Sequence, residues 1–490
     1  MKKILFVLVV SIIGFHPLFA QSTVPYSQRM ANSQMSRSGT ITSWDYPSGL
    51  FAESVLKVYS FYPIEKYLTY VVNHANATIN ASTGKIGSGY GFTDYTLDNI
   101  NPGMFLIELQ KISAKPQYKI ALDTLRKQLK KQPRTSFQTD GGFWHKKVYP
   151  HQMWLDGLYM GARFYAGYEK QYNNGAAYND IVNQFKLIHS KSYDPNYQLN
   201  YHAWSAMPTE ASSFWANKTE PFLGCSKEFW GRGEGWYAAA LVDVIEALPV
   251  SYERRKELIV IFGQVAAGIK RWQDPASGCW FQLLRYNGTF KSAKGNSNYL
   301  EASASSMFTY ALLKAIRLGI VDPTEYKTMA VKAYNGLLTN FISQDAAGNL
   351  SLNRICRSAG LGPSSSPGRD GSASYYLDGS DAGSIVSNDL KGVGPFILAS
   401  VEYEMMQKNE TGMIQHEKGE TKIKVFSDKG IITVESVQPI KEVKCFDMLG
   451  KLVALENGNS ENRIQFAFHA PKGIYLVSVN NDLSTKLSLN

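Results

Sequence analysis

Two aspartates stand among aromatic residues in the first half of the chain, where they could act as a catalytic pair. Asp98 lies in TDYTLDNINPGM, and Asp156 lies in MWLDGLYMG, two residues after Trp154. Two carboxyl groups in different surroundings can serve as a general acid and a general base. Aromatic neighbours exclude water and raise the pKa of a carboxyl group, which keeps it protonated. We therefore predict that Asp156 and Asp98 are catalytic and that Trp154 lines the substrate site.

Three further motifs would complete a site for an acidic sugar. They are FWHK with His145, YHAW with His202, and FWGRGEGW with Trp230, Arg232 and Trp236. A guanidinium group binds a carboxylate through paired hydrogen bonds, so Arg232 is predicted to hold the acidic group of the substrate. The histidines would donate hydrogen bonds to the same sugar or hold a water molecule, and the tryptophans would stack on its ring.

Each of these residues also has a purely structural interpretation. An aspartate at the start of a helix is most often an N-cap, and Asp156 precedes a helical segment. Arg232 could pair with Glu228 or Glu234, and the tryptophans and histidines could simply fill a core. The functional interpretation is favoured because several motifs converge at equivalent places in a repeat.

The repeat consists of loops and helices between residues 51 and 407. About a dozen segments there show the apolar spacing of helices, and loops rich in glycine, aromatic and acidic residues precede the helices that are rich in small residues. Four such helices contain Trp154, Trp236, Phe308 and Pro395, at spacings of 82, 72 and 87 residues. Helical hairpins at this pitch predict a ring whose loops converge on one face. A further motif of this kind, SNDLKGVGPF, carries Asp389 and Lys391.

Composition divides the chain into five parts. Residues 1–20 read as a signal peptide, with two lysines, an apolar run and a small residue at the cut. Residues 21–50 are polar and predicted to be an irregular extension, residues 51–407 form the helical domain, and residues 408–420 form a linker. Short alternating runs in residues 421–490 predict a small β-sandwich. The mature protein is expected to be secreted or at the cell surface, with a possible periplasmic stage.

Charge and cysteine content narrow the class of partner. The formal net charge is +10, and +8 without the two lysines of the signal peptide, and the basic residues are scattered. We therefore expect no nucleic-acid partner, and no later stretch is long enough to span a membrane. The four cysteines are widely spaced, so they match no zinc site and no dense disulfide framework, although export would permit one bridge. We predict neither a metal nor a cofactor.

Five segments together resemble the unsaturated glycuronyl hydrolases of glycoside hydrolase family 105, which include the unsaturated rhamnogalacturonyl hydrolases. The segments are GGFWHKKVYPHQMWLDGLYMG, NYHAWS, EFWGRGEGWYAAALVDVIEALP, NYLEASASSMFTYALLKAIRLG and SNDLKGVGPFILA. The resemblance covers roughly residues 50–407 and implies an all-α (α/α)6 barrel. It also implies removal of a 4,5-unsaturated uronic acid from the non-reducing end of acidic oligosaccharides made by polysaccharide lyases, without metal or cofactor.

The resemblance also implies roles for single residues. Asp156 would protonate C4 and help deliver water to C5, after which the ring opens and the glycosidic bond breaks, while Asp98 would orient the sugar or share the proton transfer. Substrate contacts are implied for His145, His202, Trp230, Arg232 and Trp236. Ser205 stands where many members have an aspartate, which leaves the aglycone open. Rhamnogalacturonan products and ulvan products both remain compatible.

The C-terminal segment resembles the sorting domain of the type IX (Por) secretion system. The resemblance is carried by DMLGKLV, by GIYLVSV and by a lysine near the end, and it covers residues 421–490. It implies that the export machinery is a partner. A carbohydrate-associated β-module is the alternative interpretation.

Two other functions remain open from the residues alone. A glycan-binding surface protein would keep the tryptophans but would not need both Asp98 and Asp156. An ordinary glycosidase on the same fold would need a second carboxyl group at a defined distance from the first, and Asp98 could supply it.

Overall fold

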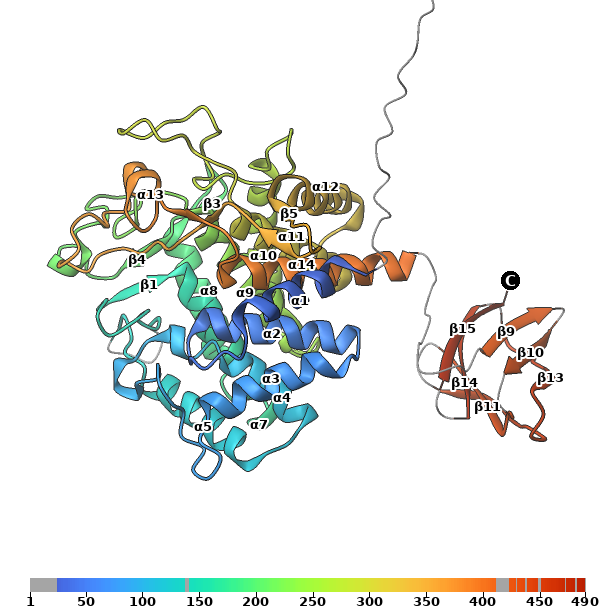
Figure 1. The fold of residues 1–490 in the computed structure, drawn as a ribbon. Helices are drawn as coiled ribbons and strands as arrows, with labels where there is room; N and C mark the ends of the chain where they lie inside the picture. The colour runs from blue at the N-terminus through green and yellow to red at the C-terminus, as the bar shows by residue number, and fades with distance from the viewer. Residues whose placement is uncertain are drawn as a thin grey trace, which may run out of the picture. The chain divides into compact units, whose positions relative to one another are not determined.

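The computed structural model describes residues 24–136, 141–410 and 423–489, apart from 429, 437–438, 448–450, 472 and 481–482. The chain forms two compact units, residues 1–406 and residues 407–490. The first unit is mainly helical and the second consists of β-strands (Figure 1). The predicted signal peptide lies outside the described residues. Within those residues, no helix combines the length and the apolar character needed to cross a membrane.

Among the residues that the structure describes, six helices form the inner layer of the first unit: α2 (Tyr46–Phe61), α4 (Gly103–Ile112), α7 (Arg163–Tyr172), α9 (Gly231–Ala247), α11 (Ala302–Arg317) and α14 (Leu390–Glu410). Helices α9 and α11 are buried over most of their length, because their glycine, alanine and serine residues let neighbours approach closely. Glu402 of α14 pairs with Arg317 of α11 at 2.6 Å and with Lys57 of α2 at 3.7 Å. These two ion pairs close the ring between its last and first helices.

Six further helices form the outer layer: α1 (Tyr26–Ser38), α3 (Glu65–Thr78), α5 (Pro116–Lys131), α8 (Tyr178–Ser192), α10 (Arg255–Arg271) and α12 (Pro323–Phe341). Each buries one face; in α10 this face contains Leu258, Ile261, Phe262, Val265 and Ile269, at the spacing of an amphipathic helix. Inner and outer helices alternate along the chain (Figure 1), which confirms the predicted (α/α)6 barrel.

Helix α1 contradicts the prediction that residues 21–50 are irregular. Its Met30 and Ala31 are fully buried, and the backbone amide and hydroxyl group of Ser27 donate to Glu404 of α14 at 3.0 and 2.5 Å. The buried face of α1 also contains Ser33 and Gln34, so the periodic apolar signal that marks the other helices is weak here. The start of α2 at Tyr46 lies in the same mispredicted segment.

Short strands and turns connect the helices on the side where the inner helices begin. The paired strands are β1 (Gln152–Trp154) with β4 (Ala203–Ser205), β2 (Tyr193–Asp194) with β3 (Leu199–Asn200), β5 (Ile342–Gln344) with β6 (Leu350–Leu352), and β7 (Ile355–Cys356) with β8 (Ile385–Val386). A short helix, α13, spans Ala373–Asp378. The β1–β4 pairing sets Trp154 opposite Ala203, so it brings the MWLD and YHAW motifs together.

The second unit contains two antiparallel sheets, as predicted for a small β-sandwich. Its strands are β9 (Ile423–Asp428), β10 (Ile431–Ser436), β11 (Glu442–Phe446), β12 (Leu452–Asn457), β13 (Arg463–Ala467), β14 (Gly473–Val479) and β15 (Leu483–Leu489). The sheet orders are β13-β10-β9 and β12-β11-β14-β15. Alternate residues such as Ile432, Val434, Val443 and Val477 are fully buried and form a separate core.

Candidate active site

Asp156 lies in the short helical turn α6 (Leu155–Gly157), directly after strand β1. A π-helical segment, Leu158–Ala162, follows it before α7 begins, and such segments recur at functional sites. Oδ2 of Asp156 accepts a hydrogen bond from Nε2 of His202 at 3.0 Å. Trp154 holds the N-cap position of this turn, so the interpretation of Asp156 as an N-cap is wrong.

Tyr376 of α13 orients His202 from the other side. The distance between the Tyr376 hydroxyl oxygen and Nδ1 of His202 is 2.6 Å, and both side chains are fully buried. Burial raises the pKa of Tyr376 well above its usual value, so the phenol stays protonated and pairs with Nδ1. Because the Asp156 carboxylate can only accept a hydrogen bond, Nε2 of the imidazole is the nitrogen that donates to it.

The electrostatic environment of Asp156 differs from the one predicted. Burial alone would raise its pKa, but the field and hydrogen bond of His202 lower the pKa below its ordinary value. The expectation that aromatic walls keep Asp156 protonated is therefore wrong for the ligand-free protein. Asp156 is a carboxylate at neutral pH until something in the site changes this balance.

Asp98 forms a second charged group with two residues of the FWHKK segment. Its Oδ2 lies 2.5 Å from Nζ of Lys146, and its Oδ1 lies 3.3 Å from Nε2 of His145. Burial lowers the pKa of His145 to about 4, and Asp98 opposes this only in part. The ring is thus neutral at pH 7, and its buried Nδ1 has no hydrogen-bond partner among the described residues.

Trp154 supports the site instead of offering a free face to a sugar ring. Its ring stacks on His145 and on Tyr149, with ring centroids 4.6 Å apart in each pair. Its edge meets His202 at 5.5 Å. Because the Trp154 side chain is only 3% exposed, its predicted stacking on substrate is not supported. The stack holds the two histidines in place.

Arg232 lies at the start of α9, buried beneath Trp230. Its Nη1 donates to the carbonyl oxygen of Cys356 at 2.6 Å and lies 3.3 Å from the hydroxyl group of Ser303, and its guanidinium carbon lies 5.0 Å from the centre of the Trp230 ring. Nε and Nη2 make no hydrogen bond to any residue that the structure describes. They remain as donors for a ligand carboxylate.

The acidic partners considered for Arg232 bind elsewhere. Glu228 pairs with Arg285 at 2.7 Å, and Glu234 accepts hydrogen bonds from Asn200. Arg232 is therefore not occupied by either of them, which favours the ligand-binding interpretation.

The two remaining tryptophans differ in position. Trp230 is buried beside His202, with ring centroids 4.6 Å apart, and donates from Nε1 to Gln282. Trp236 is buried one layer deeper, between Tyr46 at 6.3 Å and Tyr159 at 4.3 Å. Trp236 thus belongs to the core, and its predicted contact with substrate is not supported.

Tyr46 connects the charged groups of the site. Burial raises the pKa of its phenol well above the usual value; Arg232 opposes this rise, and the carboxylates of Asp98, Asp156 and Asp389 add to it. The hydroxyl group therefore lies within the field of all four. Asp389 pairs with Lys391 at 2.8 Å, so the SNDLKG motif belongs to the same end of the ring.

The inner helices give this end of the ring a positive potential. Asp156 lies in α6, the first turn of the helical run that continues into α7, Arg232 is the second residue of α9, and Asp389 immediately precedes α14. Each helix start carries a partial charge of about +0.5. Several such starts beside Arg232 and Lys146 favour an anionic ligand.

The loop of residues 357–372 borders the site near Tyr149. Nη1 of Arg369 lies 3.5 Å from the hydroxyl group of Tyr149, and the amide of Gly360 donates to the hydroxyl group of Tyr375 at 2.9 Å. Ser205, by contrast, is buried on β4 and hydrogen-bonds Ser213 at 2.7 Å. The side chain at position 205 is thus not on the rim of the site.

Four residues that the sequence did not single out contribute to this arrangement: Tyr46, Lys146, Tyr149 and Tyr376. The only sequence feature that could have indicated Lys146 is its position next to the predicted site residue His145. Tyr46 lies in the mispredicted N-terminal segment, and Tyr376 lies in a short helix 174 residues from its partner His202. Within the described residues, no three His, Cys, Asp or Glu side chains gather as a metal site.

A ring of this kind, with carboxylates and an arginine at the starts of its inner helices, is the architecture of a class of glycoside hydrolases. The model described as Glycosyl Hydrolase Family 88 matches residues 26–407, and the chain belongs to this family. A glycoside hydrolase of family 105 from C. acetobutylicum ATCC 824 is 42% identical in sequence, with a TM-score of 0.71 over 78% of this chain and 100% of that chain. The resemblance to family 105 is thereby confirmed.

Curated relatives extend this comparison. Protein Atu3128 of Agrobacterium fabrum is 34% identical over 246 residues, which are 50% of this chain and 97% of that protein. Unsaturated rhamnogalacturonyl hydrolase YesR of Bacillus subtilis is 25% identical over 285 residues, which are 56% of this chain and 72% of that protein. The chain is therefore a glycoside hydrolase of the unsaturated glycuronyl hydrolase group.

The second unit has a match of its own. The model described as Secretion system C-terminal sorting domain matches residues 428–488. This confirms the resemblance to a Por sorting domain and indicates that the protein is secreted or carried to the cell surface by export machinery.

Proposed function

We propose that the protein removes a 4,5-unsaturated uronic acid from the non-reducing end of rhamnose-linked oligosaccharides by adding water to the C4=C5 double bond. The observation that carries this proposal is the Asp156–His202 pair at 3.0 Å, in an end of the ring that also holds Arg232 with two unused nitrogens. A proton donor and a carboxylate-binding arginine are the two groups that this reaction requires.

Because the pKa of Asp156 is low in the free protein, the substrate itself has to raise this pKa when it binds. A uronate carboxylate that enters beside Asp156 brings a like charge and displaces water, and both effects raise the pKa of an aspartate. Arg232 would hold that carboxylate, so that Asp156 takes up a proton as the substrate binds. The reaction therefore does not require a raised pKa of Asp156 in the free protein.

The proposed reaction begins with addition of water to the double bond. Asp156 donates its proton to C4, while the oxygen of a water molecule bonds to C5 and returns a proton to Asp156. The product is a hemiketal at C5, which opens to a ketone. The hemiacetal left at C1 then releases the rest of the oligosaccharide, so the net reaction consumes one water molecule.

The contacts of Asp98 fit a role in substrate binding better than a role as a second catalytic carboxylate. It is engaged by Lys146 at 2.5 Å and by His145 at 3.3 Å, an arrangement suited to orienting sugar hydroxyl groups. This favours the hydration reaction over direct hydrolysis by an acid–base pair. Rhamnogalacturonan products are the leading substrates, in keeping with the name of the relative YesR, and ulvan products are the second candidate.

The experiment follows the ultraviolet absorbance of the conjugated double bond. Lyase-digested rhamnogalacturonan and lyase-digested ulvan are each mixed with the wild-type protein, with Asp156→Asn, and with Asp345→Asn. Asp345 lies in the exposed turn between β5 and β6, so this variant serves as a matched control. We expect absorbance to fall with one substrate, at least a thousandfold more slowly in Asp156→Asn and normally in Asp345→Asn.

Three results would contradict the proposal. Intact sugar binding without loss of absorbance would favour a glycan-binding protein. Hydrolysis of saturated glycosides would favour an ordinary glycosidase. Full activity of Asp156→Asn would remove that residue from the reaction.

A further inference from the structure

Glu301 is a fully buried carboxylate that lies directly before helix α11. It accepts hydrogen bonds from the backbone amides of Ser303 at 3.2 Å and Ala304 at 2.6 Å, so it caps the first turn of this helix. Capping alone does not require glutamate, because aspartate, asparagine, serine and threonine are the preferred caps. The other contacts of Glu301 indicate a second role.

The longer side chain of Glu301 also reaches the two residues that hold Arg232. Its Oε1 accepts from the backbone amide of Cys356 at 2.8 Å, and the hydroxyl group of Ser303 lies 2.8 and 2.7 Å from its two oxygens. Cys356 and Ser303 are also the two partners of Nη1 of Arg232. Glu301 therefore acts on the guanidinium group through these neighbours.

The hydroxyl group of Ser303 links Glu301 to Arg232. A hydroxyl group has one proton to donate and a carboxylate can only accept, so Ser303 donates this proton to Glu301. Its oxygen then accepts from Nη1 of Arg232 at 3.3 Å, while the carbonyl oxygen of Cys356 accepts from the same nitrogen at 2.6 Å. Both hydrogens of Nη1 are thereby used, and the orientation of the guanidinium group is fixed.

The nitrogens of Arg232 that remain, Nε and Nη2, lie on the same side of the guanidinium group. In two other arginines of this chain the same pair binds a carboxylate: Arg285 holds Glu228 at 2.9 and 2.7 Å, and Arg317 holds Glu402 at 2.6 and 2.9 Å. In Arg232 neither nitrogen is among the enclosed polar atoms that lack a partner, so both retain accessible surface. The pair is thus oriented to bind a carboxylate that comes from a ligand.

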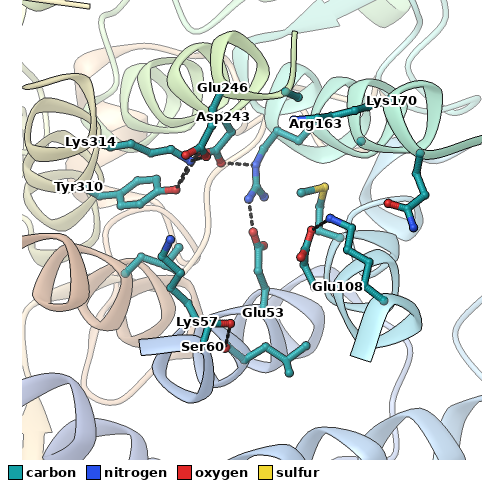
Figure 2. Close-up of a pocket in the computed structure, with 17 residues that line it drawn as sticks. Glu53, Lys57, Ser60, Glu108, Arg163, Lys170, Asp243, Glu246, Tyr310 and Lys314 are labelled. Atoms are coloured by element: carbon teal, nitrogen blue, oxygen red, sulfur yellow. Dashed lines mark hydrogen bonds and ion pairs between the residues drawn. The ribbon is translucent and has the colours of Figure 1, made fainter. Parts of the chain in front are cut away.

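Arg163 of α7 shows the opposite arrangement (Figure 2). Its Nε donates to Asp243 at 2.5 Å and its Nη2 donates to Glu53, so carboxylates of the chain occupy this pair. Both arginines are buried, and a buried cation needs a compensating negative charge. Burial would lower the pKa of Arg232, but neighbouring groups, Glu301 among them, hold it above its ordinary value. Glu301 supplies this compensation without occupying Nε or Nη2.

We propose that Glu301 is a positioning residue for recognition of the acidic sugar. It orients Ser303 and Cys356, these two residues fix Arg232, and Arg232 presents Nε and Nη2 to the substrate carboxylate. The inference rests on the proposed function, because that function makes the ligand a uronate. It assigns the preference for an acidic over an uncharged sugar to a carboxylate that does not touch the substrate.

Glu301→Asp tests this role. Aspartate is a preferred cap, so the first turn of α11 keeps its acceptor, but the shorter side chain no longer reaches the amide of Cys356. The measurement compares an unsaturated uronide from the lyase digests with its methyl ester, which lacks the carboxylate charge. We expect the ratio of kcat/KM for the acid to kcat/KM for the ester to fall about tenfold, mainly through a higher KM for the acid.

Asp322→Ala is the matched control. Asp322 caps the outer helix α12 by accepting from the amide of Thr324 at 2.8 Å, so this variant loses a cap that has no contact with Arg232. Its acid-to-ester ratio should stay within about twofold of wild type, even where the melting temperature falls. Ser303→Ala keeps Glu301 and removes only the hydroxyl group beside Arg232, and its ratio should fall about threefold.

Calorimetric titration with D-galacturonate and with its methyl ester repeats the comparison without turnover. It separates this inference from the proposed function, because a protein that leaves both lyase digests unchanged can still prefer the acid, and Glu301→Asp should then lose that preference. An unchanged preference in folded Glu301→Asp and in Ser303→Ala would reduce Glu301 to a helix cap and overturn the inference. A wild-type protein without a preference for the acid would also overturn it. If Glu301→Asp does not fold, Ser303→Ala decides.

Discussion

Tyr376 fixes the hydrogen bond that His202 makes with Asp156. The three side chains form one buried chain, with distances of 2.6 Å and 3.0 Å. A buried imidazole has two nitrogens, and the partner of one determines what the other can do. The chemistry at Asp156 therefore depends on a phenol that touches neither the substrate nor Asp156 itself.

We expect Tyr376→Phe to lower kcat/KM about tenfold. Loss of the phenol leaves Nδ1 of His202 without its partner and frees the ring to adopt the other tautomer, at a cost of about 1–3 kcal/mol for an unsatisfied buried group. Steady-state kinetics and a thermal melt measure the two effects. Tyr59→Phe, on a partly exposed tyrosine of α2, is the control. Unchanged kinetics in Tyr376→Phe would show that His202 needs no orienting partner.

At the scale of helices, glycine decides how closely the inner ring packs. A Cβ at Gly49 of α2 would lie 2.6 Å from Cα of Pro102, at the start of α4, so the two backbones could not keep their distance. A Cβ at Gly233 of α9 would lie 3.2 Å from the ring of His202. The same close packing that builds the ring thus also sets the position of a site residue.

Gly49→Ala should destabilise the first unit by about 1–3 kcal/mol, because overpacking against backbone cannot be relieved by a rotamer change. Gly263→Ala is the matched control: Gly263 is also in a helix, α10, and no atom lies within 4 Å of the added carbon. It should be neutral or stabilising by up to about 1 kcal/mol. Urea unfolding of both variants measures the difference. Equal stability of the two would mean that α2 and α4 can separate freely.

Sequence predicted the ring and the position of most of its motifs, because small-residue helices and their loops repeat along the chain. It did not predict the environment of Asp156, since the field of His202 depends on the pairing of β1 with β4. It also could not show that Trp154 is buried against His145 and Tyr149 or that Trp236 lies in the core. The sequence shows a tryptophan but not its environment: whether it lines a substrate site, stacks on other rings or fills the core depends on tertiary packing.

At the scale of the whole molecule, a buried ion network links four inner helices. Asp243 of α9 accepts from Arg163 of α7 at 2.5 Å and from Lys314 of α11 at 2.6 Å, and Arg163 also pairs with Glu53 of α2. Burial alone would raise the pKa of Asp243, but the two cations lower it to about 2. A depressed carboxyl pKa stabilises the folded state above the unfolded pKa.

The network should therefore weaken in acid. For Asp243 the contribution is about 2 kcal/mol at neutral pH, and it is lost as the pH falls from about 4 to about 2. We expect Asp243→Asn to lower the free energy of unfolding by roughly 3–5 kcal/mol at pH 7, because it leaves two buried cations short of a partner. The difference in the free energy of unfolding between Asp243→Asn and wild type should be smaller at pH 3 than at pH 7. Glu253→Gln, at a carboxylate that is 85% exposed, should show no such gap, and a constant gap for Asp243→Asn would contradict the assignment.

The two units have separate cores, so each should fold without the other. We expect a chain ending at Met406 to keep kcat/KM within about twofold of the full chain, since the candidate active site lies wholly in the first unit. Activity and circular dichroism of the shortened chain check this. A shortened chain that is folded but inactive would show that the second unit takes part in the reaction.

The four cysteines are expected not to react when the redox conditions change. All four are buried and unbridged, and burial raises the pKa of Cys225 and of Cys279 to about 12. A thiol with so high a pKa is scarcely ionised, and the thiolate is the species that oxidants and disulfides attack. The four cysteines thus leave no disulfide bond for a disulfide-forming enzyme to make, and the buried thiols are expected to resist oxidation in an oxidising environment.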